Sequence, residues 1–162
     1  MALQLSAIQL DGGVGLHFVK VLDIYEEMGG AEEPPPEPTD RRYWEAGSSA
    51  ESLGVADRVI EIIAKGGFSP RVTHNKGHIA VGTTGYNFIW LHPRKEAPHC
   101  PIHVWIGPAE RDRVLTRLRD AGLAVAARGA EEIRLRLTNA DCEQHLPLLS
   151  ETLIAIEAEA RR

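Results

Sequence analysis

Histidine and cysteine are the side chains in this sequence best suited to binding a metal or to nucleophilic chemistry. His99, Cys100 and His103 lie close together in the chain, and His92 precedes them. These are residue types that zinc prefers. The spacing is poor for a preformed site, because neighbouring side chains of an extended chain point to opposite sides and the prolines around this segment, Pro101 among them, favour an irregular turn. We therefore expect no metal site.

A cysteine nucleophile would need a histidine base held beside it. Cys142 has His145 three residues later, but it lies in the first turn of a predicted surface helix, and Cys100 neighbours His99. We interpret both thiols as packed and unreactive. The sequence holds no nucleophile elbow, phosphate-binding loop or dinucleotide fingerprint. We expect no catalytic residue and no cofactor, and a small metal-dependent enzyme is the least favoured function.

The strands that would position these residues show the most informative pattern. Four segments are rich in β-branched and aromatic residues, which favour strands. In these segments one alternate set of side chains is entirely aliphatic and should be buried beneath helices. The strands are predicted over His78–Gly82, Tyr86–His92, Ile102–Ile106 and Ile133–Leu137. The other alternate set is aromatic, imidazole or guanidinium: His78, Phe88, Trp90, His92, His103, Trp105, Arg134 and Arg136.

Along the chain, helices are predicted before, between and after these strands. Ser48 followed by Glu51 has the spacing of a capping box, in which side chains bind exposed backbone N–H groups. A second helix is predicted over Pro108–Ala121, and a third begins after Thr138, with a kink or a broken first turn at Pro147. This order of elements, with short connections between strands, predicts an α+β domain with an antiparallel sheet and helices packed on one face.

The chain before this domain has a different composition. Residues 1–28 predict a β-hairpin, with the turn at Asp11-Gly12-Gly13. Residues 29–40 contain four prolines and three glutamates, which favour an extended linker over a proline-rich ligand for an adaptor domain. We divide the chain into an N-terminal β-hairpin (1–28), a Pro/Glu-rich linker (29–40) and an α+β domain (41–162).

The net charge of −5 is unevenly distributed along the chain. Residues 1–64 carry a net charge of −8, residues 65–136 carry +6 and residues 137–162 carry −3. The basic middle segment contains the aromatic and arginine-rich strand face, so the overall charge does not exclude an anionic partner.

The predicted cellular setting rests on what the sequence lacks. No apolar run reaches the roughly 20 residues that span a bilayer, and the first residues lack the pattern of a secretory signal. Two cysteines cannot form a disulfide framework. We expect a cytoplasmic protein without a membrane partner.

An aromatic and arginine-rich sheet face is suited to stacking unpaired bases and contacting phosphates. We expect a non-catalytic binding module, and nucleic acid is the ligand that the pattern favours most. In the alternative, the hairpin, another protein or a second copy covers this face, which then serves protein–protein interaction or homodimerisation. The expected binding residues in either case are Trp90, His92, Arg94, Lys95, His103, Trp105, Arg134 and Arg136.

The second predicted helix is also basic on its outer face. Its acidic neighbours Glu110 and Asp112 favour a solvated helix face over a phosphate-binding stripe. The expected binding surface is therefore the sheet and not this helix. The helix arginines are Arg111, Arg113, Arg117 and Arg119.

Several segments carry a resemblance to a known family. They are Arg42–Glu45, Asn75–Gly82, Tyr86–Lys95 and Ile133–Thr138, followed by Asp141 and His145. In this order they resemble a bacterial domain-of-unknown-function family, over about residues 41–160. Members of that family occur alone or as C-terminal appendages, including on restriction-type and other DNA-associated proteins. The resemblance implies a small α+β domain with a binding role and no catalytic residues.

Overall fold

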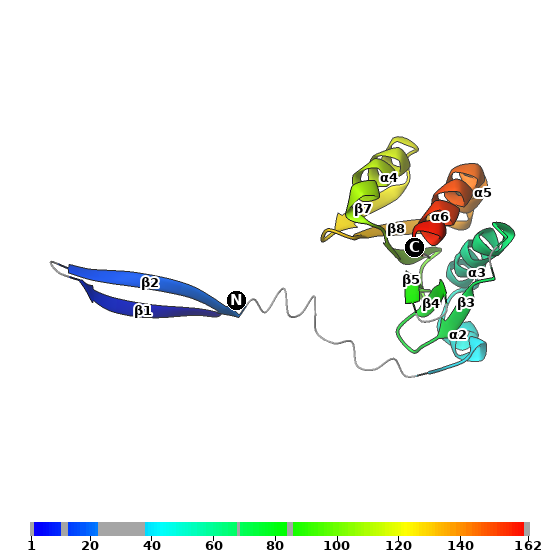
Figure 1. Ribbon diagram of the computed structural model, residues 1–162. Helices are drawn as coiled ribbons and strands as arrows, with labels where there is room; N and C mark the ends of the chain where they lie inside the picture. Colours follow the sequence, from blue (N-terminus) through cyan, green and yellow to red (C-terminus); the bar gives the residue numbers. More distant parts are fainter. Residues whose placement is uncertain (1, 11–12, 23–37, 68, 84–85, 161–162) are drawn as a thin grey trace. The chain divides into compact units, whose positions relative to one another are not determined.

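The computed structural model describes residues 2–10, 13–22, 38–67, 69–83 and 86–160. The chain divides into two compact units, Met1–Pro36 and Glu37–Arg162. In the first unit, β1 (Ala2–Leu10) pairs antiparallel with β2 (Gly13–Leu22), so the predicted hairpin is present (Figure 1). Two of the predicted turn residues (11–12), the end of the predicted hairpin and most of the predicted linker lie outside the described residues.

The second unit contains a six-stranded antiparallel sheet in the order β3-β4-β5-β6-β8-β7. The strands are β3 (Arg71–His74), β4 (Ile79–Thr83), β5 (Tyr86–Leu91), β6 (His99–Trp105), β7 (Ala124–Arg128) and β8 (Glu132–Thr138). The helices are α2 (Arg41–Gly47), α3 (Ala50–Lys65), α4 (Pro108–Asp120), α5 (Asn139–Gln144) and α6 (Leu146–Ala160). This is the predicted α+β architecture, with α2, β3 and β7 in addition to the predicted elements.

The helix α3 begins one residue later than predicted. The predicted cap, Ser48, instead ends α2 in an extended conformation. Ser49 caps α3, because its hydroxyl oxygen accepts a hydrogen bond from the Ser52 backbone N–H at 3.0 Å. The helix ends at Lys65 with Gly66 as its C-cap, and the following Gly67 has a φ of 84°, a left-handed conformation that glycine adopts readily.

The last two helices follow the predicted signals. Thr138 and Asp141 form a capping box at the start of α5, and the Thr138 backbone N–H donates to the Asp141 carboxylate at 2.8 Å. His145 separates α5 from α6. Pro147 is the second residue of α6, where a missing N–H costs no helical hydrogen bond. The predicted break near Pro147 is therefore confirmed.

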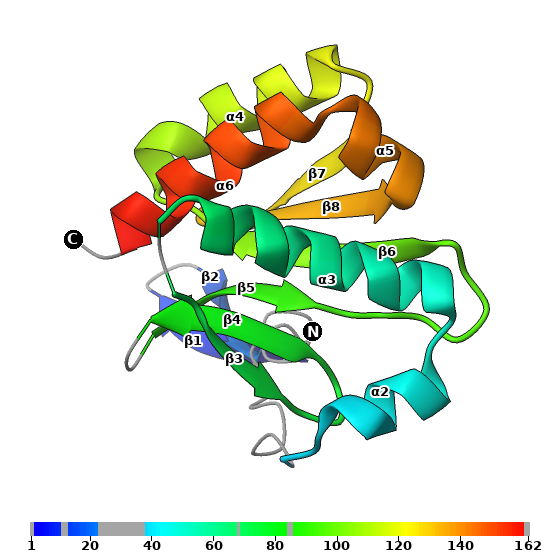
Figure 2. The same ribbon diagram turned by 90° about the vertical axis from the view of Figure 1, so that its right-hand side faces the viewer.

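Helices cover the aliphatic face of the sheet. In Figure 2, α3 lies in front of the sheet, with α5 and α6 beside it. The packing pairs are α3 with β6 and β8, α6 with β5, α5 with β8, and α4 with β7. Each fully buried aliphatic side chain here contributes about 1.5–3 kcal/mol to folding. All ten strand residues predicted for this face are buried: Ile79, Val81, Ile89, Leu91, Ile102, Val104, Ile106, Ile133, Leu135 and Leu137. None of the described helices has the length and apolar character that crossing a membrane requires.

Phe88 does not lie on the face predicted for it. Ile89 pairs with Val81, but Asn87 pairs with Gly82, which leaves Phe88 as an extra residue in β5. Such a β-bulge breaks the alternation of side chains between faces. Phe88 is accordingly fully buried in the hydrophobic core and is not part of the aromatic face.

The strand β6 contains a proline inside the sheet, so the predicted irregular turn at this position is wrong. Pro101 pairs with Arg136 on β8, and on its other side its carbonyl accepts a hydrogen bond from the His92 N–H at 2.9 Å. The nitrogen and oxygen of a strand residue point to the same side. The Pro101 nitrogen, which carries no hydrogen, therefore points toward the β5 side of β6, at a position just after Leu91, where β5 has ended. It does not point toward β8, so the ladder between β6 and β8 is unaffected.

Candidate functional site

The sheet surface opposite the helices carries most of the predicted binding residues. We call it the open face and define it by Trp90, His92, His103, Trp105, Glu132, Arg134 and Arg136. The register sets these side chains in rows. One row runs from Trp90 on β5 through His103 on β6 and Arg134 on β8 to Ala126 on β7. The next row contains His92, Pro101, Arg136 and Ala124.

Two more of the predicted residues follow β5. Arg94 is exposed, and its backbone is held by the first turn of α3. Its N–H donates to the Ser52 hydroxyl at 2.8 Å, and its carbonyl accepts from the Ser49 N–H at 2.8 Å. Lys95 is exposed in the adjoining turn. The structure therefore brings Arg94 to the open face, whereas Lys95 stands apart from the pocket described below.

Glu132 is the carboxylate at the centre of the basic groups on this face. Its Oε1 atom lies 3.1 Å from Arg134 Nε, 3.4 Å from His103 Nδ1 and 3.6 Å from Arg128 Nη1. Burial raises the pKa of Glu132, and the charge of Arg128 opposes that shift. Arg134 thus has a carboxylate partner within the face.

The His103 ring is one of three neighbouring imidazole rings. Its ring centroid lies 4.4 Å from that of His92, and the His92 centroid lies 5.9 Å from that of His78. Burial, with the neighbouring charges of His92 and Arg128, lowers the pKa of His103 to about 4. At neutral pH His103 is therefore uncharged, and its contact with Glu132 is between an imidazole and a carboxylate, not an ion pair.

An aromatic pair lies at the other end of the open face. Tyr86 and Trp105 meet edge to face with ring centroids 5.7 Å apart, and Trp105 Nε1 donates to Glu131 at 3.4 Å. Tyr86 is 40% exposed, and Trp90 and Trp105 are partly exposed. Part of each ring therefore stays available for stacking.

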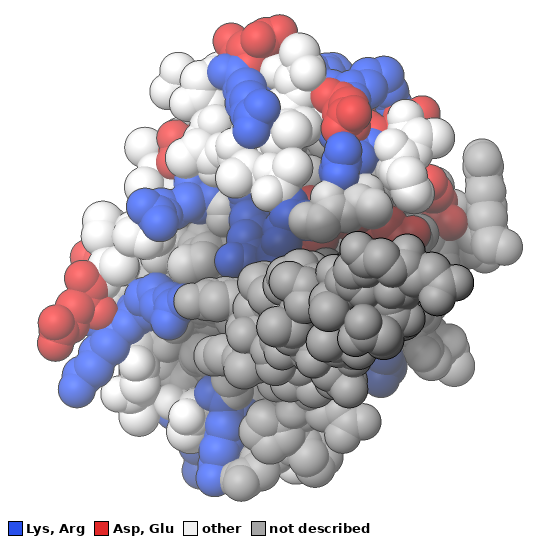
Figure 3. Space-filling view, turned by 90° about the vertical axis from the view of Figure 1, so that its left-hand side faces the viewer, with Lys and Arg blue, Asp and Glu red and all other residues white. Residues whose placement is uncertain are grey.

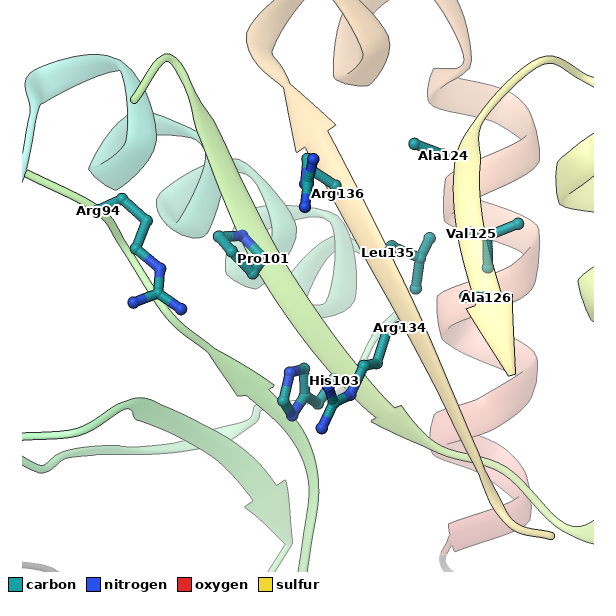
Figure 4. Close-up of a pocket in the computed structure, with 9 residues that line it drawn as sticks. All are labelled: Arg94, Pro101, His103, Ala124, Val125, Ala126, Arg134, Leu135 and Arg136. Carbon is teal, nitrogen blue, oxygen red and sulfur yellow. The ribbon is translucent and has the colours of Figure 1, made fainter. Parts of the chain in front are cut away.

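A pocket of about 540 Å³ lies between the end of β5 and the strands β6, β8 and β7 (Figure 4). Its volume is within the range of about 300–1,000 Å³ typical of ligand sites. In Figure 4 Pro101 lies between Arg94 on one side and Arg136 on the other, with His103 beside Arg134. The residues that give the pocket its character are Arg94, His103, Arg134 and Arg136, with Pro101, Ala124 and Ala126.

The pocket arginines differ in their partners. Arg134 donates to Glu132 at 3.1 Å. Within the part of the chain that the structure describes, the Arg94 and Arg136 guanidinium groups form no ion pair and no hydrogen bond. Two exposed cations thus face the pocket without a compensating carboxylate from the described residues.

The arginines of α4 behave differently. Three of them pair with carboxylates at 2.8 Å, and Arg119 donates to a backbone carbonyl. This supports the prediction of a solvated, locally neutralised helix face. The pairs are Arg111 with Asp112, Arg113 with Glu110 and Arg117 with Glu151. Figure 3, which colours charged side chains, shows that Lys and Arg are spread over several parts of the surface, so their presence alone marks no site.

The structure argues against cysteine chemistry at the positions considered from the sequence. Cys100 is fully buried on the core side of β6, whereas His99 and His103 alternate with it. Burial raises the pKa of Cys100 to about 12 and that of Cys142 to about 11, so both thiols stay protonated at neutral pH. Among the described residues, no group of three or more His, Cys, Asp or Glu side chains is arranged to hold a metal ion.

Several residues of the site were not predicted from the sequence. Glu132 comes just before the predicted strand Ile133–Leu137, yet it alternates with Arg134 and Arg136, and starting the strand one residue earlier would have placed it on the same face. The alanines of β7 carry no such signal, because alanine is a poor strand former. Tyr86 was the first residue of a predicted strand, but its contact with Trp105 depends on strand pairing.

Comparisons with known proteins add nothing to this geometry. No protein-family model, curated protein sequence or solved structure matches the chain. The resemblance to a bacterial domain-of-unknown-function family therefore stays a prediction.

Proposed function

We propose that this protein is a non-catalytic binding module that holds single-stranded nucleic acid on its open face. The observation that carries the proposal is a pocket with two guanidinium groups, Arg94 and Arg136, that have no counter-charge among the described residues. The partly exposed Trp90 pairs across the sheet with His103, which lines the same pocket. Arginines contact phosphates, and an aromatic ring stacks on any base, contributing about 1–3 kcal/mol per base. A strand running over the open face would meet both kinds of contact.

The alternative is that a protein or a second copy of this chain covers the same face. The partly exposed Tyr86, Trp90 and Trp105 suit such an interface, because aromatic residues dominate binding hot spots. The two arginines favour an anionic partner, because burying a guanidinium without a counter-charge is costly. Light scattering distinguishes this alternative, since a stable dimer without added nucleic acid would support it.

The proposal is tested by titrating labelled single-stranded DNA and RNA with the full chain and recording fluorescence anisotropy. We expect saturable binding at low salt and weaker binding to a duplex of the same sequence. No binding at tens of micromolar protein would overturn the proposal. Affinity should fall as salt rises from about 50 to 200 mM, because binding releases counterions from the strand.

Two variants that lose the same charge sharpen this test. Arg136→Gln should flatten the slope of log K against log salt by about 0.7, the value for one phosphate contact on a single strand. Arg113→Gln removes an arginine that is paired with Glu110 on α4, and it should leave the slope unchanged. Equal changes in both variants would mean that general charge, and not the open face, attracts the strand.

The cellular setting and the absence of catalysis belong to the same proposal. Cys100 and Cys142 are buried free thiols, which a reducing cytoplasm would preserve. Metal analysis of protein purified without chelator addresses the least favoured class, the metal-dependent enzyme. A stoichiometric bound metal would favour that class over a binding module.

A further inference from the structure

Among the described residues, the pocket holds more uncompensated positive charge than one internal phosphate of a strand requires. Three guanidinium groups line it, and Glu132 pairs with one of them, Arg134. Arg94 and Arg136 are left to face the pocket. An internal phosphodiester carries one negative charge, whereas a phosphate monoester carries about −1.5 to −2 at pH 7. The charge that matches the two arginines is that of a monoester.

The origin of the two side chains also suits a compact anion. Arg94 comes from the segment after β5, whose backbone is held by α3, and Arg136 comes from β8. They flank Pro101 from opposite sides (Figure 4). Each guanidinium can donate two parallel hydrogen bonds to phosphate oxygens. His103 adds no charge at neutral pH, because burial lowers its pKa to about 4.

The pocket adjoins the expected stacking platform. Trp90 pairs across the sheet with His103, which lines the pocket. The small side chains of Ala124 and Ala126 on β7 leave the other end of the pocket unfilled. A phosphate in the pocket would therefore lie next to a base on Trp90.

We infer that this pocket is a subsite for a terminal phosphate monoester, so that the protein holds the phosphorylated end of a single strand. The inference rests on the proposed function and adds the class of ligand. The shared chemistry of its ligands is a dianionic phosphate, which a strand end, a mononucleotide or inorganic phosphate can supply.

The test compares three single strands of one sequence, each with an internal label: one with a 5′-phosphate, one with a 3′-phosphate and one unphosphorylated. We expect one phosphorylated form to bind about tenfold tighter than the unphosphorylated strand, a ratio that one added charge-assisted hydrogen bond supplies. Arg94→Gln and Arg136→Gln should each reduce that ratio to about threefold or less. Arg113→Gln, which loses the same charge on α4, should keep the full ratio. Thermal melts check that all variants are folded.

The outcomes separate the inference from the proposed function. Equal binding of all three strands overturns the inference and leaves single-strand binding in place. Binding of none of them overturns both. Inorganic phosphate or a mononucleotide that competes as strongly as the phosphorylated strand shows a free phosphate site and overturns the strand-end assignment. Preference for a phosphoserine peptide over every strand overturns it as well.

Discussion

The two faces of the six-stranded sheet are made from alternate residues of the same strands, yet they meet opposite requirements. The helix-facing side is aliphatic and buried, and helices α3 to α6 pack on it. The open face keeps aromatic, imidazole and guanidinium groups at partial exposure. Because one backbone carries both sets, side-chain type alone distinguishes the two faces. Substitutions on one face should change folding, and substitutions on the other should change binding.

The largest effect is expected at the residue whose face the alternation assigns incorrectly. Phe88→Ala should lower the free energy of unfolding by about 3–5 kcal/mol, because the side chain is fully buried in the core. Trp90→Ala, two residues away, should lower it by less than about 1.5 kcal/mol, because the ring is partly exposed. Urea unfolding of both variants measures the difference. Equal losses would contradict the bulge and the separation of the two faces.

Acid should lower the free energy of unfolding through His103 on the open face. His103 has a pKa of about 4 when folded and 6.5 ordinarily, so the unfolded chain binds more protons between these values. The contribution of His103 to the free energy of unfolding is complete above pH 6.5 and is lost as the pH falls toward 4. The expected loss is about 2 kcal/mol, because the group is partly exposed. Unfolding of the parent and of His103→Gln across this pH window measures it.

The parent has to be compared with His103→Gln because Glu132 changes the free energy of unfolding with pH in the opposite direction. Burial raises its pKa, so the folded chain gains protons there as the pH falls. Glu132 is present in both proteins and largely cancels in the difference. Parallel pH profiles for the parent and His103→Gln would show that His103 does not couple folding to pH.

Binding should depend on a ring that contributes little to stability. Trp90→Ala should weaken single-strand binding about tenfold, within the range for loss of one stacked base, whereas Trp90→Phe should retain part of the affinity. Anisotropy titrations give the affinities. If Trp90→Ala binds as tightly as the parent, base stacking takes place elsewhere or not at all.

The smallest effect is expected from removing the carboxylate of the open face. Glu132→Gln leaves Arg134 without its ion pair and removes a negative charge near the pocket, so affinity should rise about two- to fivefold at low salt. Glu151→Gln is the matched control, because it frees Arg117 on α4. A gain in the control equal to that of Glu132→Gln would show that the position of the arginine is unimportant.

Much of the fold was predictable because it follows local rules. The alternation of aliphatic residues identified four of the strands, and Thr138 with Asp141 marked the start of α5. β7 was missed, because three of its five residues are alanines, Val125 is its one β-branched residue and none of its side chains is buried. Phe88 was misplaced, because a bulge shifts the period without a local signal.

The composition of the candidate site was predictable, but its charge balance was not. Arg94 and Arg136 were both named from the sequence, although they are far apart in the chain and meet only through the strand order β5-β6-β8. Sequence alone also could not show that Glu132 pairs with Arg134, while those two arginines have no carboxylate partner in the part of the chain that the structure describes. Pairing of this kind is set by non-local contacts, which periodicity does not encode.

The proline inside β6 has a consequence for the position of Arg94. A regular antiparallel pair can exchange two hydrogen bonds, but His92 and Pro101 make one, because the proline nitrogen carries no hydrogen. The hydrogen bonds between β5 and β6 stop at this pair. Two residues after His92, the backbone of Arg94 is held by Ser49, the N-cap of α3, and by Ser52 in its first turn. After β5 the backbone is therefore held by hydrogen bonds to the start of α3 and no longer by the sheet. These bonds fix the position of Arg94, which lines one side of the pocket.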